Sequence, residues 1–134
     1  MVAEEIRIPI DRDGDIVAAR QKARELAAQV GISGSDLTMI ATAISEVARN
    51  IVVYANHGEI VLSPVQSGGR RGLLVIARDE GPGIADIERA MRDGFSTGKS
   101  LGLGLPGAKR LMDEFEIASE MGKGTTITMW KWTR

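Results

Sequence analysis

Apolar residues recur every three or four positions over two long stretches of the N-terminal half, which is the spacing of amphipathic helices. The first stretch covers residues 15–30, with Asp15 as the expected N-cap and Gly31 just beyond the C-terminus. The second covers residues 33–54 and is expected to be the longest helix. Ahead of both, isoleucines alternate with an arginine and a proline over residues 5–10, which predicts a half-buried strand at a sheet edge or strand end.

The rest of the chain is predicted to form two β-hairpins, with a long loop and a third helix between them. The four strands are expected at residues 59–65, 72–78, 116–120 and 125–132. A loop rich in Gly, Asp and Ser covers about residues 80–101, with a short helical stretch at 85–91. Helical spacing resumes at 105–115, where Pro106 fits the first turn. This order has no regular βαβ repeat. It predicts one domain over residues 1–134, an α+β sandwich with an antiparallel-rich sheet and helices on one face.

The composition is that of a soluble globular domain: of 134 residues, 43% are hydrophobic and 26% are charged. The absence of cysteine excludes a disulfide framework and a Cys-liganded metal, and the lone histidine, His57, argues against a His-rich site. A formal net charge of −1 gives no general attraction to nucleic acid or an anionic membrane, so neither is expected as a partner. No uninterrupted apolar run approaches the roughly 20 residues of a spanning helix. Glu4 and Glu5 stand where a signal peptide would be basic, so a cytoplasmic location is expected.

Two glycine-rich segments match well-known nucleotide motifs only in part. Residues 102–107 satisfy G-x-G-x-x-G, but they follow a polar loop instead of the buried strand that a Rossmann site requires. Residues 94–100 have three residues between the glycines, where a Walker A loop has four. Neither a dinucleotide site of the Rossmann type nor a P-loop is therefore predicted.

Two polar residues of the second helix, Glu46 and Asn50, are spaced i, i+4 and share one face, away from the apolar stripe. The amide oxygen of Asn50 is a neutral ligand suited to Mg²⁺, which leaves Glu46 free to orient or deprotonate a nucleophile. Taken alone, the pair is more typical of an ordinary solvated helix face.

A second polar element, Asp79-x-Gly81-x-Gly83, follows an apolar strand. A carboxylate suits the exocyclic amine of adenine, and glycine lets the backbone approach a flat ring. The same residues would also make a good turn.

The last two elements are glycine-rich as well. The run Gly102-Leu103-Gly104 leads into the third helix, whose N-terminal amides would form an anion site for a triphosphate. Gly122-x-Gly124-Thr125 turns the last hairpin. Glycine is in excess overall, with 16 residues, and nine of them fall within residues 81–134. This concentration predicts where the backbone approaches a ligand.

The four elements together resemble, in order and spacing, the N, G1, G2 and G3 boxes of the GHKL superfamily, named for gyrase, Hsp90, histidine kinases and MutL. The resemblance spans nearly the whole chain. It implies the Bergerat ATP-binding fold, a two-layer sandwich with a mixed, mostly antiparallel sheet and helices on one face. Within the superfamily, the short single-domain form resembles the bacterial anti-sigma-factor serine/threonine kinases. More narrowly, residues 40–51 and 104–117 resemble the RsbT-type switch kinases of the stressosome.

The resemblance implies an ATP-dependent protein serine/threonine kinase that phosphorylates STAS-domain scaffold or antagonist proteins in a stress-response, sigma-factor regulatory pathway. When released, a protein of this type activates a partner phosphatase. The implied site residues are the base Glu46, the Mg²⁺ ligand Asn50, the adenine reader Asp79, the base-pocket residues Gly81, Gly83 and Thr125, the phosphate-binding Gly102, Leu103 and Gly104, and Lys99 as a γ-phosphate partner.

Two other classes compete with the kinase. One is a nucleotide-gated anti-sigma or scaffold-binding module with little turnover, against which Glu46 argues because binding alone needs no base. The other is a histidine-kinase catalytic domain. It is disfavoured because no helix with a phosphoacceptor histidine precedes the domain and His57 lies in a predicted turn.

Overall fold

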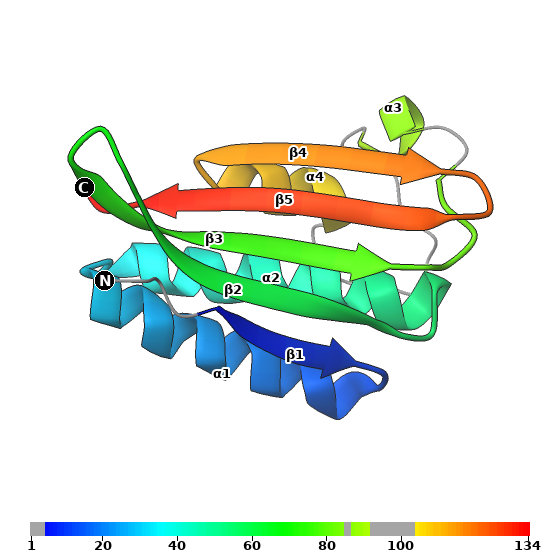
Figure 1. The fold of residues 1–134 in the computed structure, drawn as a ribbon, viewed down its shortest axis with the longest axis horizontal. Helices are drawn as coiled ribbons and strands as arrows, with labels where there is room; N and C mark the ends of the chain where they lie inside the picture. Colours follow the sequence, from blue (N-terminus) through cyan, green and yellow to red (C-terminus); the bar gives the residue numbers. More distant parts are fainter. Residues whose placement is uncertain (1–4, 85–86, 92–103) are drawn as a thin grey trace.

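A computed structural model of the chain describes residues 5–84, 87–91 and 104–134. Its elements follow the predicted order, and Figure 1 shows their arrangement. They are β1 (Ile6–Ile10), α1 (Asp13–Val30), α2 (Ser35–Tyr54), β2 (Gly58–Ser67), β3 (Arg70–Asp79), α3 (Ile87–Ala90), α4 (Gly104–Leu111), β4 (Glu114–Glu120) and β5 (Gly124–Trp132).

The five described strands form one sheet in the order β1-β2-β3-β5-β4. Helices α1, α2 and α4 all lie behind the sheet in Figure 1, so they cover one face, as predicted. Every described strand pair is antiparallel, whereas the resemblance implied a mixed sheet. The reason is the position of β5, which returns between β3 and β4 and keeps these two parallel strands apart.

The core lies between the sheet and the helices. Helix α1 contributes alanines and larger apolar residues at the predicted spacing, and α2 contributes a row of Ile and Val. The sheet contributes the alternate residues that face the helices, and the largest of these are fully buried: Ile10, Ile60, Leu62, Leu73, Val75, Ile127 and Met129. The alternation of strand residues therefore determines which face is buried.

Helix α1 begins two residues earlier than predicted, and Asp15 is not its N-cap. Asp15 lies in the first turn, where its Oδ2 accepts the backbone N–H groups of Asp11 (2.8 Å) and Arg12 (3.2 Å). Asp15 thus accepts N–H groups of residues just before the helix, whereas an N-cap residue accepts N–H groups of the first helical turn. The sequence correctly indicated that Asp15 stabilises the start of this helix, but the predicted first residue of the helix was wrong. The C-terminus is as predicted, with Gly31 at φ +105°.

The third long helix ends earlier than the pattern predicted, at Leu111, and Phe115 belongs to β4. The chain turns into the sheet at Asp113, whose N–H donates to the carbonyl of Trp130 (2.9 Å). The ammonium of Lys131 donates to the carbonyl of Leu111 (2.6 Å) and so caps the helix end. Since both bonds come from β5, spacing within the helix could not predict where it ends.

Lys131 is only 3% exposed and lies at the centre of a charge cluster beside the C-terminal end of α4. Its ammonium is 3.7 Å from Asp36 and 3.9 Å from Asp113, and Arg134 bonds both carboxylates. Burial by itself would raise the pKa of Asp113. The N–H of Trp132 and the cations Arg134 and Lys131 outweigh burial, so the pKa is lowered. The cluster ties the start of α2 to the C-terminus of the chain.

Among the described residues, α2 is the one helix long and apolar enough, by length and composition, to cross a membrane. Half of its most apolar window is buried inside the protein, against α1, α4 and the sheet. Its apolarity is thus explained by its position in the core.

Candidate nucleotide-binding site

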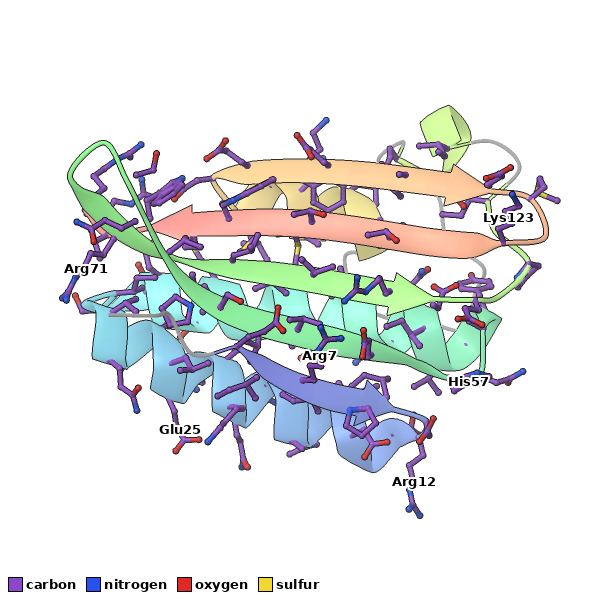
Figure 2. The ribbon with its side chains drawn as sticks, viewed as in Figure 1. Arg7, Arg12, Glu25, His57, Arg71 and Lys123 are labelled. Carbon is purple, nitrogen blue, oxygen red and sulfur yellow. The ribbon has the colours of Figure 1, made fainter. Side chains whose placement is uncertain are left out.

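A row of four residues crosses one end of the sheet, where β3 ends. Cross-strand pairing places Gly58 opposite Asp79, Asp79 opposite Thr125, and Thr125 opposite Ser119. Cross-strand partners point to the same face of a sheet, so these residues lie side by side. Thr125 is 5% exposed and alternates with Ile127, which places the row on the face covered by helices. In Figure 2, His57 and Lys123 mark this end, from the α2–β2 and β4–β5 turns.

Asp79 is held in a defined orientation. Its Oδ1 accepts the backbone N–H of Gly81 (2.9 Å) and of Thr125 (3.3 Å). Within the described ranges Oδ2 accepts no hydrogen bond, so this oxygen can accept an N–H group from a ligand. That Asp79 reads an exocyclic amine stays a prediction.

The glycines after Asp79 are required by contacts within the protein. A Cβ at Gly81 would lie 2.6 Å from the Cβ of Ala55, at the end of α2. Gly83 has φ +82°, and a Cβ there would lie 2.5 Å from the carbonyl oxygen of Glu120. The prediction was that these glycines admit a flat ring. The structure shows a further reason for glycine here, which is that both residues let the loop pack against α2 and the β4–β5 turn. Their role beside a ring stays a prediction.

Gly58 is a third glycine at this end of the sheet that contacts within the protein require, and the sequence pattern assigned it only to a turn. A Cβ at this position would collide with the carbonyl oxygen of Arg78 and would lie 2.9 Å from Cγ2 of Ile51 and 3.1 Å from Cβ of Asp79. Helix α2 therefore packs against the Gly58 end of the row. Asn50, the neighbour of Ile51, is brought to the same end of the sheet.

Ser119 was also missed by the sequence reading, although it bonds three other residues of the site. The N–H of Ile84 donates to its Oγ (2.7 Å), Ser119 donates to the carbonyl of Gly124 (3.1 Å), and the hydroxyls of Ser119 and Thr125 are 2.8 Å apart. The signal that could have revealed it is a polar residue at an inward position of a strand, after Phe115 and Ile117.

Glu46 does not lie on a solvated helix face, so the alternative interpretation of the Glu46–Asn50 pair as ordinary surface residues is wrong for Glu46. It is 6% exposed, because α4 packs over this side of α2. Its Oε1 accepts the N–H of Gly104 (3.1 Å), the first residue of α4, and lies 3.4 Å from Nη1 of Arg49. Asn50 is half-buried one turn further along α2, and within the described ranges its amide has no hydrogen-bond partner. The predicted base thus lies at the predicted phosphate-binding end of α4.

Helix α4 begins at Gly104, which has φ +68°, and Pro106 lies in its first turn as predicted. Lys99, Gly102 and Leu103 lie outside the described residues. Their predicted roles at the phosphates stay predictions.

Comparison with known proteins agrees with this geometry. The profile of the family described as "Histidine kinase-like ATPase domain" matches residues 9–131. The chain therefore belongs to the histidine kinase-like ATPase family. In Bacillus subtilis (strain 168), the serine/threonine-protein kinase RsbT is 52% identical over 127 residues, covering 95% of this chain and 96% of that protein. The anti-sigma F factor of Thermoanaerobacter sp. (strain X514) is 34% identical over 120 residues, covering 85% and 82%. The predicted class, a protein serine/threonine kinase related to anti-sigma factors, is confirmed.

Two solved structures are similar to the whole chain. A Mycobacterium tuberculosis structure containing RsbU and RsbW domains has a TM-score of 0.64 and 26% identity, and covers 100% of this chain and 33% of that chain. The mycobacterial sensor histidine kinase MprB has a TM-score of 0.59 and 18% identity, and covers 99% of both chains. The second likeness concerns the fold alone. The predicted α+β sandwich of the GHKL type is confirmed.

Proposed function

We propose that this chain uses Mg-ATP to phosphorylate a serine or threonine of a STAS-domain scaffold or antagonist protein, within a bacterial stress-response pathway that regulates a sigma factor. On release from that partner, it would activate a phosphatase. The site of action would be the cytoplasm. The similarity to RsbT and to anti-sigma F factors supports the partner-switching part of the proposal. The neighbour that combines RsbU and RsbW domains supports a phosphatase partner.

One observation carries the catalytic part: the buried carboxylate of Glu46 lies 3.1 Å from the first N–H of α4. A helix N-terminus attracts phosphate, and a base beside it is placed to accept the proton of an attacking hydroxyl. In the proposed step, the acceptor oxygen forms a bond to the γ-phosphorus and gives its proton to Glu46, while ADP leaves. Arg49 would keep the carboxylate in place.

The remaining roles follow from the row at the sheet end. Asp79 Oδ2 would accept the adenine amine, and Thr125 and Gly83 would line the base pocket. Asn50 offers one amide oxygen, which fits a Mg²⁺ ion that keeps most of its ligands as water and phosphate. Asn50 would hold the ion, whose positive charge would offset the negative charge of the phosphates.

The test is phosphotransfer with the full chain, Mg-ATP and a panel of STAS-domain proteins, read as phosphoserine or phosphothreonine. We expect transfer by the wild type and little by Glu46→Gln. The matched control is Glu25→Gln, because Glu25 is an exposed glutamate of α1 (Figure 2). This variant should transfer phosphate at the wild-type rate. No transfer by the wild type to any member of the panel would contradict the proposal.

The second candidate is a nucleotide-gated binding module with little turnover, which the similarity to anti-sigma F factors favours. It predicts that the chain captures a sigma factor or scaffold only with bound nucleotide and that no phosphate is transferred. The same assay, run with a sigma-factor panel and a binding readout, separates the two.

A further inference from the structure

We propose that Ser119 is a positioning residue that makes the hydroxyl of Thr125 a hydrogen-bond acceptor and so helps the site select a 6-amino purine over a 6-oxo purine. The inference rests on the proposed function, because it takes the row of Asp79, Thr125 and Ser119 as the base pocket. It adds a positioning residue, Ser119, that lies outside the four family boxes.

The argument begins with the single proton of the Ser119 hydroxyl. A serine hydroxyl donates one hydrogen bond and accepts two. The N–H of Ile84 can only donate, and it lies 2.7 Å from Oγ. The carbonyl of Gly124 can only accept, and it lies 3.1 Å away. Ser119 therefore donates its only hydroxyl proton to the carbonyl of Gly124, and its second acceptor position is left for Thr125.

The bond between the two hydroxyls then has only one possible direction. Oγ of Ser119 and Oγ1 of Thr125 are 2.8 Å apart. With the proton of Ser119 already used, Thr125 must donate. Thr125 is 5% exposed, so its hydroxyl gains from satisfying this bond within the protein. Once it has donated, its oxygen can only accept.

The site consequently presents two acceptors side by side. Asp79 pairs directly with Thr125 across β3 and β5, and the carboxylate is an acceptor only. Adenine carries an amino group at position 6, with two hydrogens to donate. Hypoxanthine and guanine carry an oxygen there, which would face two further acceptors without a donor. Leaving such polar groups unpaired is costly.

Adenosine and inosine triphosphates are suitable probes, because they differ at position 6 and in the proton on N1. We define the selectivity as the Kd for inosine triphosphate divided by the Kd for ATP, measured with Mg²⁺ on the full chain. We expect the wild type to prefer ATP by at least roughly tenfold, the effect of one hydrogen bond.

Ser119→Ala should lower this selectivity by roughly tenfold, because the proton of Thr125 becomes free to meet the oxygen at position 6. Ser119→Thr keeps the hydroxyl and should keep the selectivity. The matched control is Ser63→Ala, since Ser63 is a half-buried serine on the opposite face of the same sheet. It should leave both dissociation constants unchanged.

A purely structural role for Ser119 would give a different result. Ser119 also fastens the loop at Ile84, so losing it could weaken both nucleotides equally. A selectivity within twofold of the wild type in Ser119→Ala overturns the proposal, whatever the absolute affinities. If Ser119→Ala does not fold, Thr125→Val decides: it removes the acceptor, so lower selectivity supports the proposal and unchanged selectivity overturns it.

Failure of the inference can be told apart from failure of the proposed site. If the wild type binds neither nucleotide, or if Asp79→Asn binds ATP as the wild type does, the proposed base pocket is wrong. If ATP binding depends on Asp79 and only the Ser119→Ala selectivity is unchanged, the pocket stands and the role of Ser119 is wrong. A wild type with no preference for ATP also overturns the inference.

Discussion

Replacing Asp79 with Asn should separate nucleotide binding from folding, because the two oxygens of this carboxylate have different roles. Oδ1 accepts the N–H groups of Gly81 (2.9 Å) and Thr125 (3.3 Å), and an asparagine Oδ1 can accept both in the same geometry. Oδ2 is the oxygen proposed to receive the adenine amine. In the variant an NH₂ group takes its place, so a donor would face a donor.

The magnitude follows from these bonds. A hydrogen bond to a charged group contributes about 1.5–3 kcal/mol, and its loss weakens ATP binding by about 10- to 150-fold. The two backbone bonds survive as neutral bonds of roughly half the strength, so the free energy of unfolding should fall by only about 1–2 kcal/mol. Asp79→Ala should cost more stability, because it leaves the N–H groups of Gly81 and Thr125 without an acceptor.

The assay is a titration of the full chain with Mg-ATP, combined with urea unfolding of the same samples. Asp11→Asn is the charge-matched control, because Asp11 is exposed in the β1–α1 turn. Asp79→Asn should also lose less affinity for inosine triphosphate than for ATP, since its NH₂ can donate to the oxygen at position 6. ATP binding within threefold of the wild type, or global unfolding of the variant, would refute the reasoning.

Three further predictions concern catalysis, pH and the loop. Glu46→Gln should lower the phosphotransfer rate by about 10²- to 10⁴-fold with little change in ATP affinity; single-turnover rates check this, and a rate like that of Glu25→Gln would contradict it. The pKa of Asp113 is lowered by folding, so its contribution to stability is full above the ordinary pKa of 3.8 and is lost as pH falls through the folded value. Between pH 5 and 3, the free energy of unfolding measured in urea should therefore fall more for the wild type than for Asp113→Asn. Equal dependence of this free energy on pH in the two proteins would show that the cluster does not act this way. Gly83→Ala should destabilise the chain by about 1–3 kcal/mol, since it strains the backbone at φ +82°. Gly14→Ala, at a helical position with nothing within 4 Å of the added Cβ, should be neutral or stabilising, and thermal unfolding of the two variants compares them.

The order and type of the elements were predictable because they are recorded locally in the sequence. The three-to-four spacing of α1 and α2 and the alternation of β1 arise from residues close together in the chain, so each element shows its own buried face. The candidate boxes were found for the same reason. Their residues are short local runs, and only their order along the chain had to be added.

The tertiary structure alone decided which of these residues meet. Glu46 is buried because α4 packs over α2. The residue spacing within α2 could not predict this contact, because α4 follows some 50 residues later in the chain. Ser119 reaches Thr125 through the register of β4 on β5, and a shift of one residue would turn it to the other face. The antiparallel sheet depends on β5 lying between β3 and β4. The sequence by itself thus determined the elements and the chemistry they carry. Long-range packing and strand register decided how that chemistry is arranged, because contacts between distant segments leave no periodic signal in either one.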